Sequence, residues 1–208
     1  MHLILDFDFT IYRVGVLYEK WKRLFAGMEM DWQAFDQHAH DLFWEGFTAE
    51  KHAQRLGIPE SQIAKLVREH LKDIETESPS LLYEDVVPFF EKHEGAHRCT
   101  ILTHGDPEYQ DLRIQASGVG ALVDDIRIAT PTMRKRDHLR ELVEANGEPL
   151  LFVDDNPNEL VHIHEAGLPI TLVRMNRGEG HYAEVKHEGD QNKWSCVSNL
   201  EELEEHVS

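Results

Sequence analysis

Two apolar runs of the sequence end in closely spaced aspartates. Asp6 and Asp8 follow the first run, and Asp154 and Asp155 follow the second. Each pair taken alone is equally consistent with a functional site and with a structural role, as a solvated strand end or a helix N-cap. Carboxylates that converge in one place raise one another's pKa unless a cation lies among them. Carboxylate oxygens suit Mg²⁺, which usually keeps several waters and binds a substrate phosphate. The residue types therefore predict a magnesium site if the fold brings the two pairs together.

Short apolar strands alternate with amphipathic helices around these acids, and this alternation predicts an α/β fold. Strands are expected at 2–7, 99–102, 126–128, 150–153 and 170–173. Helices are expected at 106–117, at 136–145 and directly after the acids that follow the 150–153 strand. The pattern is typical of a parallel sheet with helices on both faces, in which ligands bind at the carboxyl ends of the strands. Both acid pairs should then lie at one edge.

A helix-like segment separates the first strand from the rest. Apolar residues recur at helical spacing between positions 18 and 90, with almost no alternating pattern. We therefore expect a core formed by residues 1–15 and 86–208, and an all-helical insertion over 16–85. Polar residues 176–193 are expected to form a surface loop before a last helix at 200–207.

The composition excludes several classes of function. With 39 acidic and 21 basic residues the formal charge is -18, which opposes general nucleic-acid binding. No run approaches the length needed to span a bilayer, and the N-terminus enters a strand directly. Cys99 and Cys196 are far apart and outside any metal-binding spacing. A soluble, cytoplasmic protein is expected.

The run from Leu3 to Thr10 resembles the first motif of the haloacid dehalogenase-like (HAD) superfamily, in which apolar residues precede Asp-x-Asp-x-Thr. Thr103 after an apolar strand resembles the second motif, Lys135 the third, and Asp154-Asp155 the fourth. The four occur in the family's order. The resemblance implies a Rossmann-like, HAD-type core with a helical cap between the first two motifs.

Family chemistry then gives each acid a role. Asp6 would be the nucleophile that forms an aspartyl-phosphate, and Asp8 the general acid and base. Magnesium would be held by the Asp6 carboxylate, the Asp8 carbonyl and Asp155, with Asp154 binding directly or through water. Asp8 favours phosphoryl transfer, because members that cleave carbon–halogen bonds lack an acid there.

The remaining motifs supply groups for the phosphate. Thr103 would donate to a phosphoryl oxygen, and Lys135 would contribute positive charge, although Arg134 and Arg136 flank it. His104 either contacts substrate or is a hydrogen-bonded loop residue.

The sequence departs from the family at two places. Phe9 stands where many members have glycine, and Glu159 stands where a shorter acid is common. Glu159 is expected either to support the metal from the outer shell or to face solvent. Tyr12 and Arg13 are expected to reach the substrate or to form a hinge.

Aromatic residues of the helical insertion have two interpretations. They either pack inside the cap, which helical spacing favours, or line an aromatic substrate pocket. The residues concerned are Trp21, Trp32, Phe35, Phe43, Trp44 and Phe47.

These observations favour a Mg²⁺-dependent phosphatase acting on a small phosphorylated substrate. A mutase-like phosphotransferase would use the same intermediate, and a catalytically silent binding module would retain the acids for other reasons. The sequence leaves the oligomeric state undetermined.

Overall fold

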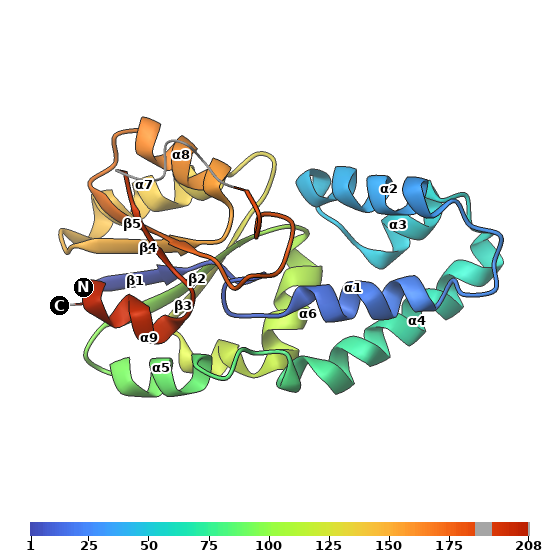
Figure 1. The fold of residues 1–208 in the computed structure, drawn as a ribbon, viewed down its shortest axis with the longest axis horizontal. Coiled ribbons are helices and arrows are strands. Elements are labelled where there is room, and N and C mark those ends of the chain that lie inside the picture. Colours follow the sequence, from blue (N-terminus) through green and yellow to red (C-terminus); the bar gives the residue numbers. More distant parts are fainter. Residues whose placement is uncertain (186–192, 208) are drawn as a thin grey trace.

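A single parallel β-sheet forms the centre of the molecule in the computed structural model, which describes residues 1–185 and 193–207 (Figure 1). Its strands lie in the order β3-β2-β1-β4-β5-β6 and all pair in parallel. Their bounds are β1 His2–Leu5, β2 Arg98–His104, β3 Asp125–Ala129, β4 Leu150–Asp154, β5 Ile170–Met175 and β6 Ser195–Val197. The α/β prediction is confirmed. The sixth strand was not predicted.

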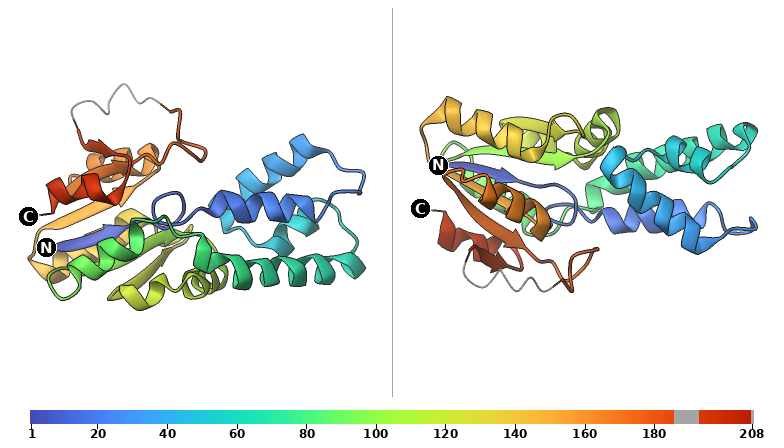
Figure 2. Two further views of the ribbon diagram at one scale, coloured as in Figure 1. Left: turned by 60° about the horizontal axis from the view of Figure 1, so that its bottom comes forward. Right: turned by 90° about the horizontal axis from the view of Figure 1, so that it is seen from above.

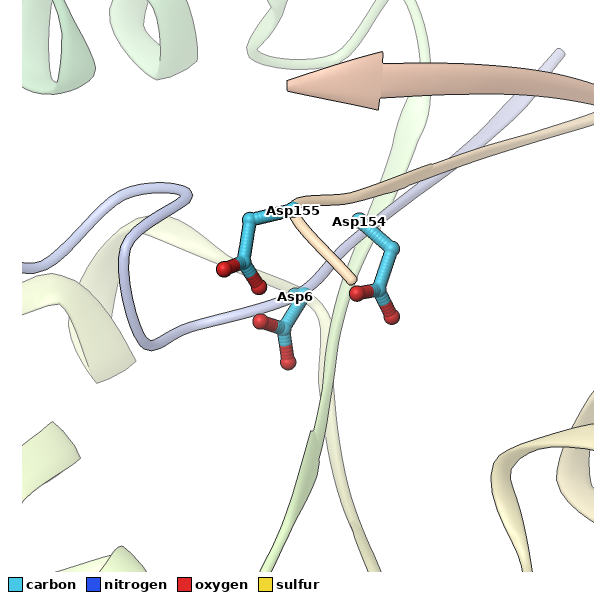
Figure 3. Close-up of side chains that lie close together, drawn as sticks. All are labelled: Asp6, Asp154 and Asp155. Atoms are coloured by element: carbon cyan, nitrogen blue, oxygen red, sulfur yellow. The ribbon is translucent and has the colours of Figure 1, made fainter. Parts of the chain in front are cut away.

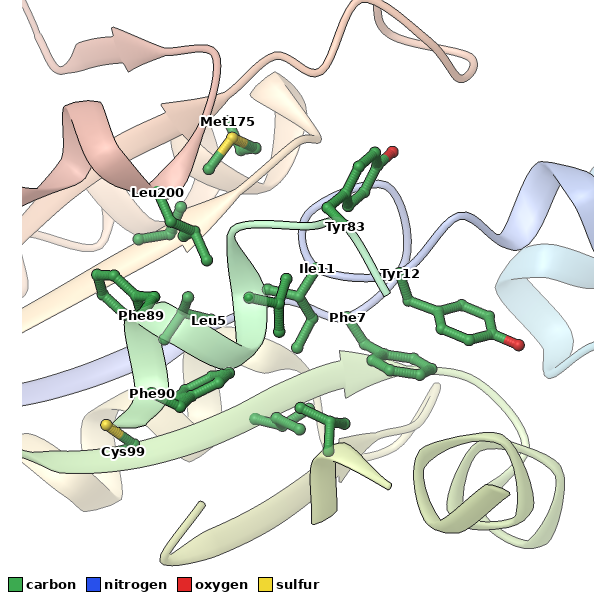
Figure 4. Close-up of a cluster of buried hydrophobic side chains, with 14 of the residues drawn as sticks. Leu5, Phe7, Ile11, Tyr12, Tyr83, Phe89, Phe90, Cys99, Met175 and Leu200 are labelled. Carbon is green, nitrogen blue, oxygen red and sulfur yellow. The ribbon is translucent and has the colours of Figure 1, made fainter. Parts of the chain in front are cut away.

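Helices cover both faces of the sheet. The α7 helix (Lys135–Asn146) and the α8 helix (Pro157–Glu165) pack on one face against Ile4 and Phe152. The α5 helix (Val86–His93), α6 (Pro107–Ser117) and α9 (Leu200–Leu203) pack on the other face. Short 3-10 turns occur at Val119–Leu122 and Glu204–His206. Figure 4 shows the hydrophobic core on this second face, where Leu5 packs near Phe89, Phe90 and Leu200. Strands buried on both faces explain why the sequence shows apolar runs rather than alternation.

Strand register brings the two acid pairs to one edge. Leu5 of β1 lies between Ile101 of β2 and Val153 of β4. The Asp6 N–H continues this ladder, since it donates to the Val153 carbonyl at 2.8 Å. Asp6 therefore emerges beside Asp154, at the carboxyl ends of the central strands.

The segment between β1 and β2 is helical. It contains α1 (Val14–Arg23), α2 (Trp32–Glu45), α3 (Ala49–Arg55), α4 (Glu60–Glu77) and a 3-10 turn at Ser78–Ser80. Figures 1 and 2 place these helices beyond the carboxyl ends of the strands. Residues 14–85 contribute no strand to the sheet, and the first helix begins two residues before the expected boundary at 16. No helix in the described ranges is long and apolar enough to cross a membrane.

The helical segment has its own core, built around Trp21, Phe25 and Phe35. Buried His52 lies within it and is fixed in one tautomer. The Trp21 Nε1–H can only donate and lies 2.9 Å from His52 Nδ1, so the His52 Nε2–H donates to the Phe35 carbonyl at 3.0 Å. Burial lowers the pKa of His52 to about 4.

This histidine should make stability depend on pH. The folded pKa lies below the unfolded value, so the contribution is complete above about pH 6.5 and is lost as the pH falls toward 4. Between pH 7.5 and 5.0 we expect His52 to account for a loss of ~2 kcal/mol in the free energy of unfolding, measured by urea denaturation.

His52→Gln isolates this contribution, because the glutamine amide can accept from Trp21 and donate to Phe35 without titrating. Between pH 7.5 and 5.0, the free energy of unfolding of this variant should fall by ~2 kcal/mol less than that of the wild type. Exposed His162 gives the matched control, His162→Gln, which should behave as the wild type does. An unchanged loss in His52→Gln would contradict the assignment.

Candidate active site

Three aspartates converge at the carboxyl edge of the sheet. Asp6 follows β1, Asp154 ends β4 and Asp155 comes next, and Figure 3 shows that their carboxylates lie close together. One ligand oxygen from each lies within 4.8 Å of the other two. The predicted convergence of the two strand ends therefore occurs.

Lys135 lies among these acids. Its Nζ donates to Asp6 Oδ1 at 2.6 Å and to Asp154 Oδ2 at 2.8 Å, and all three side chains are buried. Lys135 is the first residue of α7, so its side chain starts at the edge where the strands end. Arg136 instead pairs weakly with Asp137 at 3.6 Å. Of the lysine and its two flanking arginines, Lys135 is thus the one bonded to Asp6.

Asp154 has both oxygens engaged within the protein. Its Oδ1 accepts from the Asn156 N–H at 2.8 Å, while Oδ2 accepts from Lys135. This carboxylate is suited to orient Lys135 and Asp6, and a metal would reach it more readily through water. The side chain of Asn156 in turn caps α8.

The cluster carries excess negative charge. Burial, together with nearby Asp154, raises the pKa of Asp6 to about 8 against the opposing effect of Lys135. Burial and the same neighbouring acids raise the pKa of Asp155 well above its ordinary value. Three carboxylates and one ammonium sum to a formal charge of two negatives when all are ionised. A divalent cation would balance that charge.

The donor set fits magnesium. Mg²⁺ binds hard oxygen ligands at about 2.1 Å in an octahedron, which sets ligand oxygens about 3–4 Å apart. The observed spacing, up to 4.8 Å, needs only a small closure of the side chains. Asp6 and Asp155 are the residues that would hold the ion directly.

The Asp8 side chain is bound by Arg113 rather than by Lys135. The guanidinium of Arg113, on α6, donates to both Asp8 oxygens at 2.7 Å, and Arg113 is buried. Gln110, one turn earlier, accepts from Arg113 and places its own amide 3.5 Å from Asp8. Because the Asp8 side chain is held here, any role in binding metal falls to its backbone carbonyl. Neither Arg113 nor Gln110 was identified from the sequence.

Thr103 and His104 end β2 on the neighbouring side of Asp6. Thr103 is buried and borders the same cavity as the aspartates. The His104 ring lies 5.8 Å from the rings of both Phe43 and Trp44, measured between centroids. Burial, aided by the charge of Lys135, lowers the pKa of His104, so this imidazole is uncharged at neutral pH.

A cavity of about 480 Å³ joins these groups to the helical segment. It is bordered by every site residue expected from the sequence: Asp6, Asp8, Thr103, His104, Lys135, Asp154 and Asp155. Glu159 also borders it, and burial raises the pKa of that carboxyl. Glu159 therefore faces the site rather than bulk solvent.

Tyr12 and Arg13 do not border the cavity. The Tyr12 hydroxyl pairs with Ser78 Oγ at 2.7 Å, and the Arg13 guanidinium stacks 4.8 Å from the centre of the Tyr83 ring. Both residues therefore connect the segment that leaves the sheet after β1 to the segment that returns to it. Contact with the substrate through Tyr12 or Arg13 is not supported, and Tyr12 is buried rather than packed on the surface.

The segment expected to be a surface loop packs against the site over its described part, 176–185; residues 186–192 lie outside the described residues. Arg177 donates to the Thr10 carbonyl at 3.0 Å and to Asp85 at 2.6 Å. His181 and Tyr182 border the cavity, and the His181 ring lies 5.1 Å from His40 of α2. The described part is an irregular, mostly exposed loop, as predicted, but its packing against the site through the Arg177 contacts was not anticipated.

Phe9 explains how closely this segment approaches. Phe9 has φ 56°, a left-handed conformation that suits glycine better than phenylalanine. Its ring covers Gly180, where a Cβ atom would come within 2.8 Å of the ring carbons. Gly15, at the start of α1, lies against the same ring. The departure from the family motif therefore adds an aromatic contact between three segments.

We expect Gly180→Ala to destabilise the protein more than Gly178→Ala does. Both glycines have positive φ, 90° and 74°, but a Cβ at Gly178 meets nothing within 4 Å. Gly178→Ala thus reports the backbone cost alone, whereas Gly180→Ala adds a clash with Phe9 of ~1–3 kcal/mol. Thermal unfolding of both variants checks this.

The double variant Phe9→Ala/Gly180→Ala tests the cause. Without the Phe9 ring, Gly180→Ala should cost little more stability than Gly178→Ala does. Additive effects of the two substitutions would show that Phe9 does not contact Gly180.

Comparisons with known proteins agree on the architecture. No protein-family model and no curated protein matches the chain. Among solved structures, a protein of Burkholderia xenovorans LB400 assigned as a haloacid dehalogenase-like hydrolase matches with TM-score 0.76 and 21% identity over 98% of both chains. The L-2-haloacid dehalogenase of Xanthobacter autotrophicus, with chloropropionic acid covalently bound, matches with TM-score 0.69 and 15% identity over 99% of this chain and 97% of that one.

A third structure carries a metal. YfnB of Bacillus subtilis, assigned as a HAD-hydrolase and bound to magnesium, matches with TM-score 0.67 and 15% identity over 100% of this chain and 98% of that one. The chain thus has the fold of the HAD-like hydrolases.

Proposed function

We propose that this protein is a Mg²⁺-dependent phosphohydrolase that cleaves a small phosphomonoester through an aspartyl-phosphate on Asp6. The observation that carries the proposal is the buried bond from Lys135 to Asp6, within a cluster of three aspartates at the carboxyl edge of the sheet. Asp6 follows β1 directly and borders the cavity, so an oxygen of its carboxylate can face a substrate phosphorus. The magnesium bound to YfnB supports the metal assignment by analogy of fold.

Each neighbouring group has a distinct task. Lys135 holds the Asp6 carboxylate and places positive charge beside the transferring phosphoryl group. The Thr103 hydroxyl would donate to a phosphoryl oxygen from the adjacent strand. Asp6 and Asp155 would hold magnesium, which when bound offsets repulsion between the anionic nucleophile and the anionic substrate.

Asp8 separates phosphoryl transfer from dehalogenation. A phosphate ester needs a proton for its leaving alcohol, and the subsequent attack of water on the aspartyl-phosphate needs a base. Asp8, two residues after Asp6 and at the same cavity, can serve both steps. A halide leaving group needs no proton, so the acid supports a phosphatase over the activity of the structural relative from Xanthobacter.

The direct test measures phosphate release from p-nitrophenyl phosphate with and without Mg²⁺. We expect turnover that disappears on chelation with EDTA and returns when Mg²⁺ is restored. Chloride release from 2-chloropropionate, measured in parallel, should be absent. A phosphotransferase would instead release less phosphate than p-nitrophenol when a sugar alcohol is added as acceptor. Chloride release without phosphate release would overturn the proposal.

A further inference from the structure

The cavity has two chemically different ends. Its floor is the polar cluster around Asp6, and its wall is rich in aromatic side chains. The aromatic side chains of the wall are Phe9, Tyr18, Trp21, Phe43, Trp44, Phe47, Tyr109 and Tyr182. They come from the turn after β1, from the helical segment, from α6 and from the 176–185 segment, so aromatic side chains of four segments line the same cavity as the aspartates. A leaving group attached to a phosphate on Asp6 would extend into this aromatic region.

Phe43 and Trp44 are the most distinctive members of the wall. Both are large apolar side chains that remain exposed, by 37% and 42%, although Phe35 and Leu42 of the same helix are buried. Their rings meet edge to face with centroids 5.2 Å apart, and both approach His104 beside Thr103. Exposed aromatic surface next to reactive groups is typical of a ligand-binding wall. The cap-packing interpretation is right for Phe35, whereas Phe43 and Trp44 have a free face toward the cavity.

The positive charges around the cavity are already engaged. Lys22 donates to both oxygens of Asp36, at 2.7 and 2.9 Å. Arg113 holds Asp8, and Lys135 holds Asp6 and Asp154. Among the described residues of the wall, every lysine and arginine is thus paired with a carboxylate.

Two further acidic residues border the cavity beside these ion pairs. Glu19 and Glu159 border it, while burial keeps the imidazole of His104 neutral. A second negative charge on the substrate would have to displace one of these ion pairs. The wall therefore disfavours a leaving group that carries a carboxylate or another phosphate.

We propose that the natural substrate is the phosphate ester of an aromatic alcohol whose ring is uncharged or cationic, with the ring packed against Phe43 and Trp44. This inference rests on the proposed phosphohydrolase function and adds a substrate class to it. The phosphate faces Asp6 and Thr103, and the ring lies near His104. A cavity of about 480 Å³ is within the usual range for binding a small organic ligand.

The test compares three esters whose leaving alcohols need similar help: benzyl, ethyl and 4-carboxybenzyl phosphate. With Mg²⁺ present, kcat/KM for benzyl phosphate should exceed that for ethyl phosphate at least ~10-fold, because the ring buries apolar area against the wall. The added carboxylate should lower kcat/KM at least ~10-fold relative to benzyl phosphate. Equal values for all three esters, or a preference for the carboxylated one, would overturn the substrate class while leaving the phosphatase function standing.

Variants identify the wall residues. Phe43→Ala and Trp44→Ala should each reduce the ratio of benzyl to ethyl kcat/KM by ~3- to 10-fold, since each removes part of the ring's contact. Trp32→Ala is the matched control, because Trp32 lies on the same helix, is 39% exposed and does not border the cavity. It should keep the wild-type ratio. If Trp32→Ala lowered the ratio of benzyl to ethyl kcat/KM and Trp44→Ala did not, the preference would belong to another surface.

Binding separates failure of the inference from failure of the proposed function. Asp6→Asn, which should not turn substrate over, is titrated calorimetrically with benzyl phosphate and ethyl phosphate. If the wild type hydrolyses no ester but this variant binds benzyl phosphate more tightly, the aromatic site stands and the phosphatase proposal falls. If hydrolysis is observed without any preference in binding or rate, the substrate class alone is wrong.

Discussion

Asp6→Asn should abolish phosphate release, with a fall in kcat of at least ~10⁴-fold, because the amide cannot attack phosphorus to form the covalent intermediate. The fold should survive. Burial disfavours the charged form of the Asp6 carboxyl and raises its pKa to about 8, so a neutral amide of the same shape is tolerated there. Lys135 keeps its bond to Asp154 in the variant.

The measurement pairs single-turnover phosphate release with thermal unfolding. Wild-type protein quenched during turnover should carry a phosphoryl group on Asp6, located by mass spectrometry, and the variant should carry none. A variant that releases phosphate at a rate near that of the wild type would show that water attacks the ester directly and that Asp6 serves only the metal.

Asp111→Asn provides a matched control. Asp111 is an exposed carboxylate of α6 that bonds Gln115 on the same helix and does not border the cavity. Its substitution should leave turnover unchanged, which separates the effect of position 6 from that of removing any one acid.

The acid cluster could be predicted because all strands of a parallel sheet end at the same edge. Apolar runs before Asp6 and Asp154 identify two buried parallel strands, and parallel strands deliver their next residues to the same edge. Lys135 required the family resemblance as well, since a lysine beginning a helix is common. Its bond to Asp6 depends on where α7 begins relative to β3, which local sequence does not specify.

Arg113 could not be found in this way. It lies in the middle of a helix with weak amphipathic character, between apolar residues, and its partner Asp8 is far away in the sequence. Which face of α6 meets Asp8 is decided by packing against the sheet and the helical segment. A buried arginine also looks like any surface arginine in the sequence.

The sixth strand and the anchoring of the 176–185 loop were missed for a different reason. Ser195–Val197 is a short edge strand in a polar region, and only pairing with β5 defines it. Residues 176–185 show no periodicity, because they are held by side-chain pairs such as Arg177 with Asp85 rather than by regular backbone bonds. Long-range ion pairs leave no local pattern to read.

The contacts of Arg113 sharpen the role expected for Asp8. A guanidinium has donors only, so it satisfies both oxygens of an ionised Asp8 but loses one bond if that carboxyl is protonated. To act as a general acid, Asp8 must turn one oxygen from Arg113 toward the leaving alcohol. Arg113 is thus a positioning residue, placed to hold the carboxylate ready to act as a base.

Asp8→Asn should therefore lower kcat for ethyl phosphate by 10²–10⁴-fold, the usual size of a general acid–base contribution. The variant keeps the backbone carbonyl assigned to magnesium and one oxygen that can accept from Arg113. Replacing the anionic partner of a buried guanidinium should also cost up to ~3 kcal/mol of stability. Rates must therefore be measured well below the melting temperature of the variant, established by circular dichroism.

The loss should depend on the leaving group, which a purely structural role would not produce. Nitrophenolate departs without a proton, so the first step survives in Asp8→Asn and p-nitrophenyl phosphate should give a burst of nitrophenol. Slow turnover should follow, because water attacking the aspartyl-phosphate still lacks its base. Arg113→Met is the comparison, since it breaks the same ion pair but leaves the Asp8 carboxylate in place. If both variants lost activity equally on ethyl and nitrophenyl esters, with no burst, Asp8 would serve only to hold Arg113.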